Sequence, residues 1–170
     1  MKNIINNSII SLVYLEPNMS YDIWQNSLDD DNRKFVPDEV FETLEEATEV
    51  VNQLIESYKS IDGPFIYPVI RNSDNANLGY VQLVKIEEGW EIGYHIAKKY
   101  TGNGYATEAV KLFLEYLKKN TSIKEIYGIA LYDNKASKKV LEKCRFKTIF
   151  KGKSLYQGNK RKIIKTIIEL

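Results

Sequence analysis

Apolar residues recur at helical spacing in two long stretches of the chain. In the first stretch they fall at i, i+3, i+4, i+7, i+8 and i+11, at Ala47, Val50, Val51, Leu54, Ile55 and Tyr58. This stripe predicts a helix that packs one face on a core, and the capping-box pair Thr43 and Glu46 marks its start. The second stretch carries its stripe at Ala106, Ala109, Val110, Phe113, Leu114 and Leu117. It predicts the strongest helix of the chain, which begins directly after a glycine-rich turn.

Shorter apolar or alternating runs predict strands, at residues 11–16, 65–70, 78–86, 90–96, 125–132, 146–150 and 162–170. Two more helices are expected, one capped by Asn18 or Ser20 and running to Leu28, the other starting at Asn134. The polar stretch 29–35 predicts a loop. The order of elements favours an α+β fold, with a mixed, mostly antiparallel twisted sheet of about six to seven strands and about four helices. One strand–helix–strand crossover surrounds the glycine turn.

Length and composition narrow the class of protein. A chain of 170 residues can hold its own core, and no linker or repeat divides it, so we expect one domain over residues 1–170. Lys and Arg total 24 against 23 Asp and Glu, so the overall charge gives no case for a nucleic-acid or membrane partner. Cys144 is the single cysteine, which excludes an internal disulfide, and no apolar run has the length of a transmembrane helix. We expect a cytoplasmic protein.

Gly102 and Gly104 stand between the strand at 90–96 and the second long helix. Backbone amides at a helix N-terminus are unpaired and carry positive partial charge, so a turn that aims them at one point makes an anion site. Glycine lets an anion approach the backbone closely. GNGYAT has neither the lysine ending of a P-loop nor the third glycine of a dinucleotide fingerprint. A phosphate seat and a plain strand-to-helix turn both stay open at this point.

Several stretches, in the same order, resemble the GNAT superfamily of acyl-CoA N-acyltransferases. YTGNGYATEAV follows a WEIGYHI strand, DNKASKKVLEKCRF comes after it, and LVYLEP near the start is similar to the branch that acetylates ribosomal-protein N-termini and varied small amines. The resemblance implies a GNAT fold and acetyl transfer from acetyl-CoA, without a metal. The implied acceptor is a primary amine, of a protein N-terminus or a small molecule, which attacks directly in a ternary complex.

The resemblance places coenzyme A on the glycine turn, on the end of the preceding strand, where relatives splay two strands, and on the next helix. The residues implied are Ile96, Ala97, Lys99, Thr101, Gly102, Asn103, Gly104, Tyr105, Ala106, Asn134 and Ser137. Lys99 departs from the Arg or Gln of relatives, so it keeps a charge but lacks the forked donors of arginine. Arg145 stands where relatives usually have glycine. A left-handed backbone would cost arginine on the order of 1 kcal/mol there, so we expect a different local turn.

Amine acetylation needs a neutral amine, so a general base is useful at neutral pH. Strand alternation puts Glu91, Gly93 and His95 on one face and the apolar and aromatic residues Trp90, Ile92, Tyr94 and Ile96 on the other. The first face gives two candidate bases about 13 Å apart. We favour Glu91, since relatives often keep a carboxylate on this strand. His95 is either a second catalytic candidate or a hydrogen-bonded, partly buried histidine. Many relatives protonate the leaving thiolate with a tyrosine on the last helix; this helix has none, and Ser137 is the implied substitute.

Charged segments elsewhere leave other functions open. Asp29, Asp30 and Asp31 lie in a segment that by resemblance lines the acceptor cleft, where they would attract a cationic amine or form a solvated loop. Residues 145–170 carry eight Lys or Arg and one acid, which would meet the 3′-phosphate of the cofactor, an acidic partner or RNA. The alternatives are therefore a non-catalytic acyl-CoA-binding protein of the same fold and an RNA-associated module. A homodimer is left open.

Overall fold

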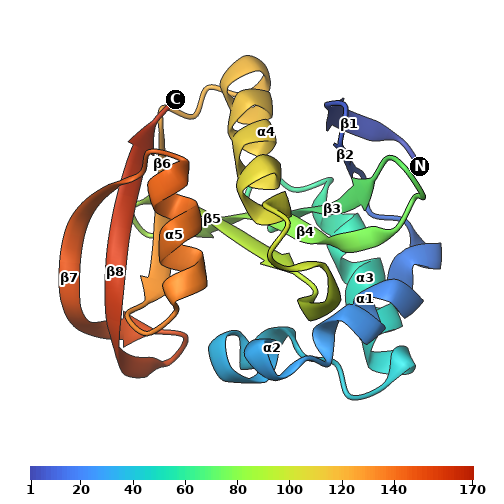
Figure 1. Cartoon of the computed structure of the whole chain (residues 1–170), viewed down its shortest axis with the longest axis horizontal. Coiled ribbons are helices and arrows are strands. Elements are labelled where there is room, and N and C mark those ends of the chain that lie inside the picture. Colours follow the sequence, from blue (N-terminus) through green and yellow to red (C-terminus); the bar gives the residue numbers. More distant parts are fainter.

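The computed structural model describes residues 1–170, and its eight strands form one sheet in the order β1-β2-β3-β4-β5-β6-β8-β7 (Figure 1). The strands are β1 (Asn3–Asn6), β2 (Ile10–Val13), β3 (Phe65–Arg71), β4 (Asn77–Ile86), β5 (Gly89–Ile96), β6 (Glu125–Leu131), β7 (Lys147–Tyr156) and β8 (Asn159–Glu169). Neighbouring strands are antiparallel, except for the parallel pair β5 and β6. The sheet is therefore mixed and mostly antiparallel, as the sequence predicts.

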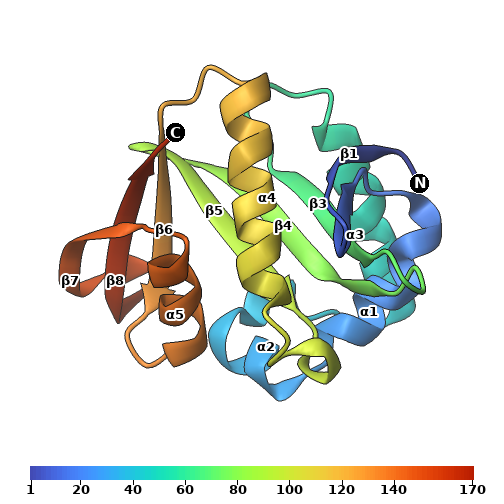
Figure 2. The same ribbon diagram turned by 45° about the horizontal axis from the view of Figure 1, so that its top comes forward.

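Helices cover both faces of the sheet. The α-helices are α1 (Ser20–Ser27), α2 (Asp30–Phe35), α3 (Leu44–Ser57), α4 (Tyr105–Asn120) and α5 (Lys135–Lys143), and the short 3-10 helices are η1 (Pro17–Met19), η2 (Pro37–Glu39) and η3 (Lys98–Tyr100). α4 crosses one face beside α5, whereas α1 and α3 pack together on the opposite face (Figures 1 and 2). α2 lies at the lower edge of both views, near the turn that precedes α4.

The predicted apolar stripe of α4 lies at the centre of the larger core. Val110, Phe113 and Leu117 are buried, in one cluster with Val81 of β4 and Ile92 of β5. Burying a side chain of this size contributes about 1.5–3 kcal/mol. Because strand side chains alternate, the residues between these on β4 and β5 face the opposite side of the sheet.

α3 builds a smaller core on that opposite face. Its N-cap, Thr43, accepts a hydrogen bond from the Glu46 amide at 3.1 Å, as the capping-box pattern predicts. The carboxylate of Glu46 reaches one residue further back and accepts from the amide of Glu42 at 2.9 Å. Val51 is fully buried and clusters with Val13 of β2. This packing fixes α3, and α1 beside it, over β3 and β4.

The α+β class and the antiparallel meander β3–β4–β5 are confirmed, but the structure has eight strands and five α-helices. The sequence does not predict β1, because NIIN has no alternation and becomes a strand only by pairing with β2. The predicted loop at 29–35 is wrong, since Asp30–Phe35 form α2. Asp29 caps this helix by accepting a hydrogen bond from the Asn32 amide at 2.9 Å.

α5 ends at a left-handed residue, Arg145, with φ of 66°. The Phe146 amide donates to the carbonyl of Leu141 at 3.0 Å, and the Arg145 amide donates to the carbonyl of Glu142 at 2.9 Å. This is the bond pattern of a Schellman motif. The expectation of a different local turn is therefore wrong: Arg145 takes the conformation that glycine would take, and the Schellman bonds offset its steric cost.

The predicted crossover is confirmed in β5, α4 and β6. β5 and β6 are parallel and pair at Glu91 and Tyr127. From there they diverge toward their C-terminal ends, as Figure 1 shows. One edge of the C-terminal half of β5 is consequently left without a strand partner, directly before the glycine turn.

Candidate active site

The glycine turn joins η3 to α4. Gly102 and Gly104 have φ values of 83° and 81°, in the left-handed region that glycine adopts without steric cost. A Cβ atom at either glycine would meet no protein atom within 4 Å. The backbone conformation therefore requires glycine here, and the space above both residues is open to a ligand.

The amides of this turn have no acceptor within the protein. None of the six backbone N–H groups from Gly102 to Thr107 donates an internal hydrogen bond. Side chains hold the turn instead: the Thr101 hydroxyl donates to the carbonyl of Lys98 at 2.9 Å, and the Asn103 amide group donates to the carbonyls of Tyr100 and Thr101 at 3.1 Å. These bonds use carbonyl oxygens and leave the amides free at the positive end of a 16-residue helix. The turn therefore fits a phosphate group.

Two lysines precede the turn and behave differently. Lys98 is tied to α2, because its ammonium lies 2.6 Å from Asp31 and its amide donates to Asp29 at 3.1 Å. Lys99 is exposed, forms no ion pair, and places its ammonium 5.0 Å from the centre of the Tyr100 ring. Lys99 is thus the lysine available to an anion on the turn.

The end of β5 offers backbone groups to the open edge, but not at both predicted residues. The Ala97 amide donates to the carbonyl of Leu78 at 2.8 Å, and the Ala97 carbonyl accepts from Tyr100 at 2.8 Å. Both backbone groups of Ala97 are therefore occupied. Antiparallel alternation with β4 turns the backbone of Tyr94 and Ile96 toward the unpaired edge. Ile96 and Tyr94 therefore present backbone groups to the open edge, and Ala97 does not.

A cleft of about 850 Å³ lies where β5 and β6 diverge. Strands β4, β5, β6 and β8 contribute to its lining. Other lining residues are Asn134 and Ser137 at the start of α5, residues 154–158 of the β7–β8 hairpin, and Phe35, Val36 and Glu39 from the end of α2 to η2. The structure thus brings the predicted Glu91, Asn134 and Ser137 to one cavity. The glycine turn follows the strand that forms one wall of this cleft.

Glu91 is a partly buried carboxylate in the cleft. Burial raises its pKa to about 7, against a hydrogen bond from the Tyr156 hydroxyl, 3.4 Å from Oε1, and the charge of Lys165, which lower it. Glu91 forms no ion pair, because the ammonium of Lys165 lies 2.5 Å from Glu88 instead. A carboxylate that titrates near neutral pH can accept a proton from an amine more readily than an ordinary glutamate.

A second carboxylate, Glu39, borders the same cleft and was not predicted. Its Oε1 accepts a hydrogen bond from Gln82 at 2.9 Å, and its other oxygen accepts one from the Tyr80 hydroxyl. Burial raises the pKa of Glu39 as well. Glu39 lies outside every motif of the sequence, in the short η2 segment, so only the tertiary structure reveals it.

Ser137 has a tyrosine partner from β5. The Tyr94 hydroxyl lies 2.9 Å from the Ser137 hydroxyl and donates to the Ser137 carbonyl at 2.9 Å. Burial holds the pKa of Tyr94 well above its ordinary value, so the hydroxyl stays protonated. Asn134 caps α5 by accepting from the Ser137 amide at 3.0 Å. A tyrosine hydroxyl therefore lies beside Ser137, but it comes from β5 and not from the last helix.

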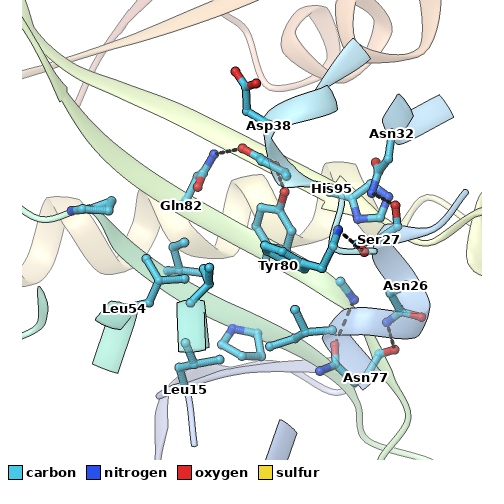
Figure 3. A pocket seen from close by; sticks show the side chains of 18 of the residues that line it. Leu15, Asn26, Ser27, Asn32, Asp38, Leu54, Asn77, Tyr80, Gln82 and His95 are labelled. Atoms are coloured by element: carbon cyan, nitrogen blue, oxygen red, sulfur yellow. Dashed lines mark hydrogen bonds between the residues drawn. The ribbon is translucent and has the colours of Figure 1, made fainter. Parts of the chain in front are cut away.

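His95 does not line this cleft. It borders a second cavity, beneath α1 and α3 (Figure 3), and its Nε2 lies 3.4 Å from Asp29. Burial alone would raise the pKa of Asp29, but bonds from His95 and from the amides of Asn32 and Lys98 lower it to about 2. The Asp29–His95 pair joins the end of β5 to the start of α2.

The three aspartates 29–31 are also absent from the cleft. Asp29 caps α2 and Asp31 pairs with Lys98, so both serve contacts within the chain. Among the basic residues of the C-terminal hairpin, the ammonium groups of Lys151 and Lys162 lie 4.9 and 3.9 Å from the centre of the Tyr132 ring. No group of three His, Cys, Asp or Glu side chains is arranged to hold a metal ion. None of the helices combines the length and apolar character needed to span a bilayer.

Comparison with known proteins identifies relatives of this chain. A protein from Bacillus subtilis, the uncharacterized N-acetyltransferase YnaD, is 29% identical over 123 residues, which are 71% of this chain and 69% of that protein. A GNAT-family acetyltransferase from Bacillus anthracis has a similar crystal structure, with a TM-score of 0.81, 24% identity and coverage of 97% of each chain.

RimL, the ribosomal L7/L12 α-N-protein acetyltransferase, solved in complex with coenzyme A, superposes with a TM-score of 0.85 at 16% identity, over 99% of this chain and 98% of that one. At these identities the solved structures show a shared fold. The family model for the acetyltransferase (GNAT) domain matches residues 17–147, well over half of the chain. This chain therefore belongs to the GNAT family of acetyltransferases, which transfer an acetyl group from acetyl-CoA to an amine.

Proposed function

We propose that the acceptor is a primary amine, of a protein N-terminus or a small molecule, and that it attacks acetyl-CoA directly in a ternary complex. The observation that carries this proposal is the run of unbonded amides from Gly102 to Thr107, at the end of the strand whose Glu91 lies in the cleft. The amides supply a seat for an anion, and the carboxylate supplies a base. Both substrates would thus meet along β5.

Acetyl-CoA supplies an activated thioester when bound. Different parts of the chain would bind its diphosphate and its pantetheine arm. The amides from Gly102 to Ala106 would hold its diphosphate, with Lys99 adding positive charge and Thr101 and Asn103 keeping the turn in shape. The open edge of β5 at Ile96 would pair with the amide groups of the pantetheine arm, in the manner of an added strand.

The base must generate a neutral amine. An alkylamine has a pKa of about 10.4 and an α-amine about 8, so both arrive mostly protonated at pH 7. With its pKa near 7, Glu91 is about half ionised at that pH and accepts the ammonium proton. The nitrogen then bonds to the acetyl carbon, and the carbon–sulfur bond breaks with its electron pair leaving on sulfur.

The leaving thiolate needs one proton. Ser137 lines the cleft, and its hydroxyl lies 2.9 Å from the protonated hydroxyl of Tyr94. Tyr94 would pass its proton through Ser137 to the sulfur and regain one from the amine by way of solvent. His95 faces another cavity, which supports its alternative reading as a hydrogen-bonded histidine.

Thiol release from acetyl-CoA across a panel of amines and peptide N-termini tests the proposal, with calorimetric titration of acetyl-CoA beside it. Turnover of at least one amine is the expected result. Binding without turnover of any amine would favour the alternative, a non-catalytic acyl-CoA-binding protein. Absence of binding would contradict both.

The non-catalytic alternative rests on three departures from the family pattern: Lys99, Arg145 and the lack of a tyrosine on the last helix. Arg145 adopts the left-handed conformation of the usual glycine, and the Tyr94 hydroxyl beside Ser137 would serve in place of the missing helix tyrosine. Lys99 in place of arginine is then the one departure that still favours the non-catalytic alternative. We also propose that residues 1–170 act as one domain in the cytoplasm; a homodimer stays a prediction.

A further inference from the structure

The cleft adjoins the second cavity, which we call the inner cavity. The inner cavity has a volume of about 320 Å³ and lies between α1, α3 and the sheet (Figure 3). Its surface is mostly apolar, with Leu15, Ile23, Val50, Leu54, Ile66 and Pro68 among its lining residues. Glu39, Gln82 and Val84 line both cavities. A ligand in the cleft therefore has an apolar space next to it, on the side of Glu39.

Most polar groups that line the inner cavity are already engaged within the chain, although the side-chain nitrogen of Asn77 has no hydrogen-bond partner. The side-chain amide of Asn26 donates to the carbonyl of Asn77 at 3.0 Å, and that of Asn32 donates to the carbonyl of Ser27 at 3.2 Å. His95 pairs with Asp29. These groups have little left to offer a polar ligand, so the inner cavity suits an apolar one.

The cleft beside it holds two carboxyl groups that have no cationic partner. Glu39 and Glu91 both line it, and neither forms an ion pair with a lysine, arginine or histidine. Lys165, the one cation of the lining, is paired with Glu88 at 2.5 Å. Buried carboxylates are normally paired, so these two are suited to a cation that arrives from solution.

Glu39 is held in a fixed orientation toward the cleft. Gln82 and Tyr80 each donate to one of its carboxylate oxygens. Gln82 can reach Glu39 because it lies across Gly93 of β5, where a Cβ atom would be only 2.5 Å from its Nε2. A glycine in the middle of the catalytic strand thus makes room for the side chain that positions Glu39.

We propose that the acceptor is a primary amine with an apolar side group: its ammonium is held between Glu39 and Glu91, and its side group lies in the inner cavity. This rests on the proposed function and names the class of its acceptor. Glu91 takes one proton from the ammonium, which leaves a neutral amine beside Glu39. The amide product is neutral, so the attraction of Glu39 is lost on transfer and the product is released.

A matched pair of amines tests the substrate class on the unaltered protein. Pentylamine and 1,4-diaminobutane have chains of similar length and similar ammonium groups, but the second ends in another ammonium. We expect kcat/KM to be at least about tenfold higher for pentylamine than for either 1,4-diaminobutane or ethylamine. Equal values for pentylamine and ethylamine, or a preference for the diamine, would overturn the inference.

Two substitutions separate the roles of charge and cavity. Glu39→Gln should raise KM for pentylamine about tenfold or more and leave KM for acetyl-CoA within about twofold. Val50→Phe, which fills the inner cavity from α3, should raise KM for pentylamine and leave that for ethylamine unchanged. Glu49→Gln, an exposed carboxylate on the same helix, is the matched control. An equal rise in KM for both amines in Val50→Phe would contradict the placement of the side group.

Failure of the inference and failure of the proposed function give different results. Turnover of amines without preference for pentylamine would leave the function standing and remove the inference. If no amine turned over, calorimetric titration of pentylamine into the complex with coenzyme A would decide. Binding that Glu39→Gln weakens would support the inference, and absence of binding would overturn it.

Discussion

Glu91→Gln should slow acetyl transfer and, at the same time, stabilise the folded chain. The substitution keeps the size of the side chain and an oxygen for the hydrogen bond from Tyr156, but it removes the base. General-base catalysis typically contributes 10²–10⁴-fold, so we expect kcat to fall by about 10²-fold or more. In the unaltered protein a pKa of about 7 makes the ionised fraction rise from about one tenth at pH 6 to about nine tenths at pH 8. The pH profile of kcat should show this rise, and the variant should lose it.

The stabilising effect follows from the same shift. Burial raises the pKa of Glu91 from 4.5 to about 7, which corresponds to up to about 3 kcal/mol at about 1.4 kcal/mol per pH unit. Because the folded chain holds this proton more tightly than the unfolded chain, the free energy of unfolding is highest below the unfolded pKa. It decreases as the pH rises toward the folded pKa and stays low above it. A glutamine does not ionise, so the variant escapes this loss at pH 8 and gains about 1 kcal/mol or less near pH 5.

Thiol release measures kcat between pH 5.5 and 9, and thermal unfolding at pH 5 and pH 8 measures stability. For a domain of this size, 1 kcal/mol corresponds to about 2–4 °C in Tm, so the gain at pH 8 is at most about 12 °C. Glu125→Gln, an exposed carboxylate on β6, is the control and should change neither quantity. The reasoning is refuted if Glu91→Gln keeps kcat within threefold, or if its Tm at pH 8 is no higher than that of the unaltered protein.

Three further predictions test other parts of the structure. Arg145→Gly should stabilise the chain by about 0.5–1 kcal/mol in thermal or urea unfolding, because glycine relieves a left-handed residue at φ 66°; Arg145→Ala should give no gain, and an equal gain would contradict the strain. Gly104→Ala should weaken acetyl-CoA binding about tenfold in calorimetry while costing about 1 kcal/mol of stability, since its Cβ meets no protein atom; unchanged affinity would count against the anion seat. Tyr94→Phe should lower kcat about tenfold without changing KM, and adding Ser137→Ala should have little further effect if the two hydroxyls form one relay; additive losses would separate them.

Local patterns predicted the elements that depend on local sequence. The capping box at Thr43 and the apolar stripe of α4 predict where these helices lie, because caps and helical periodicity need no distant partner. β1 and α2 lack such signals. α2 consists of five polar or charged residues and one aromatic residue, Phe35, and it is capped by Asp29, which also accepts a hydrogen bond from the Lys98 amide. Its stability comes from a contact 69 positions away in sequence, and no window of sequence contains both partners.

The residues of the candidate site also divide into those that a local sequence signal predicts and those that it does not. The glycine turn, Glu91 and Ser137 could be named because each lies in a stretch that resembles the family. Strand alternation assigns Tyr94 to the apolar face of the sheet. If β5 and β6 did not diverge, Tyr94 would be a core residue only. β6 pairs with β5 only at Glu91, so Tyr94 lines the cleft between the two strands. Glu39 carries no local signal at all, since an acid after proline in a short polar turn is ordinary surface sequence.

The charges around the cleft explain why Glu91 keeps its raised pKa beside a lysine. Lys165 faces the cleft from β8, and a direct ion pair with it would lower the pKa of Glu91 and weaken it as a base. Glu88, in the turn before β5, pairs with that ammonium at 2.5 Å instead. Lys165 therefore lowers the Glu91 pKa only through space, and Glu39 and Glu88 oppose it with charge of the other sign. The base near neutral pH is thus a property of three surrounding charges as well as of burial, and it depends on Glu88 holding the lysine away.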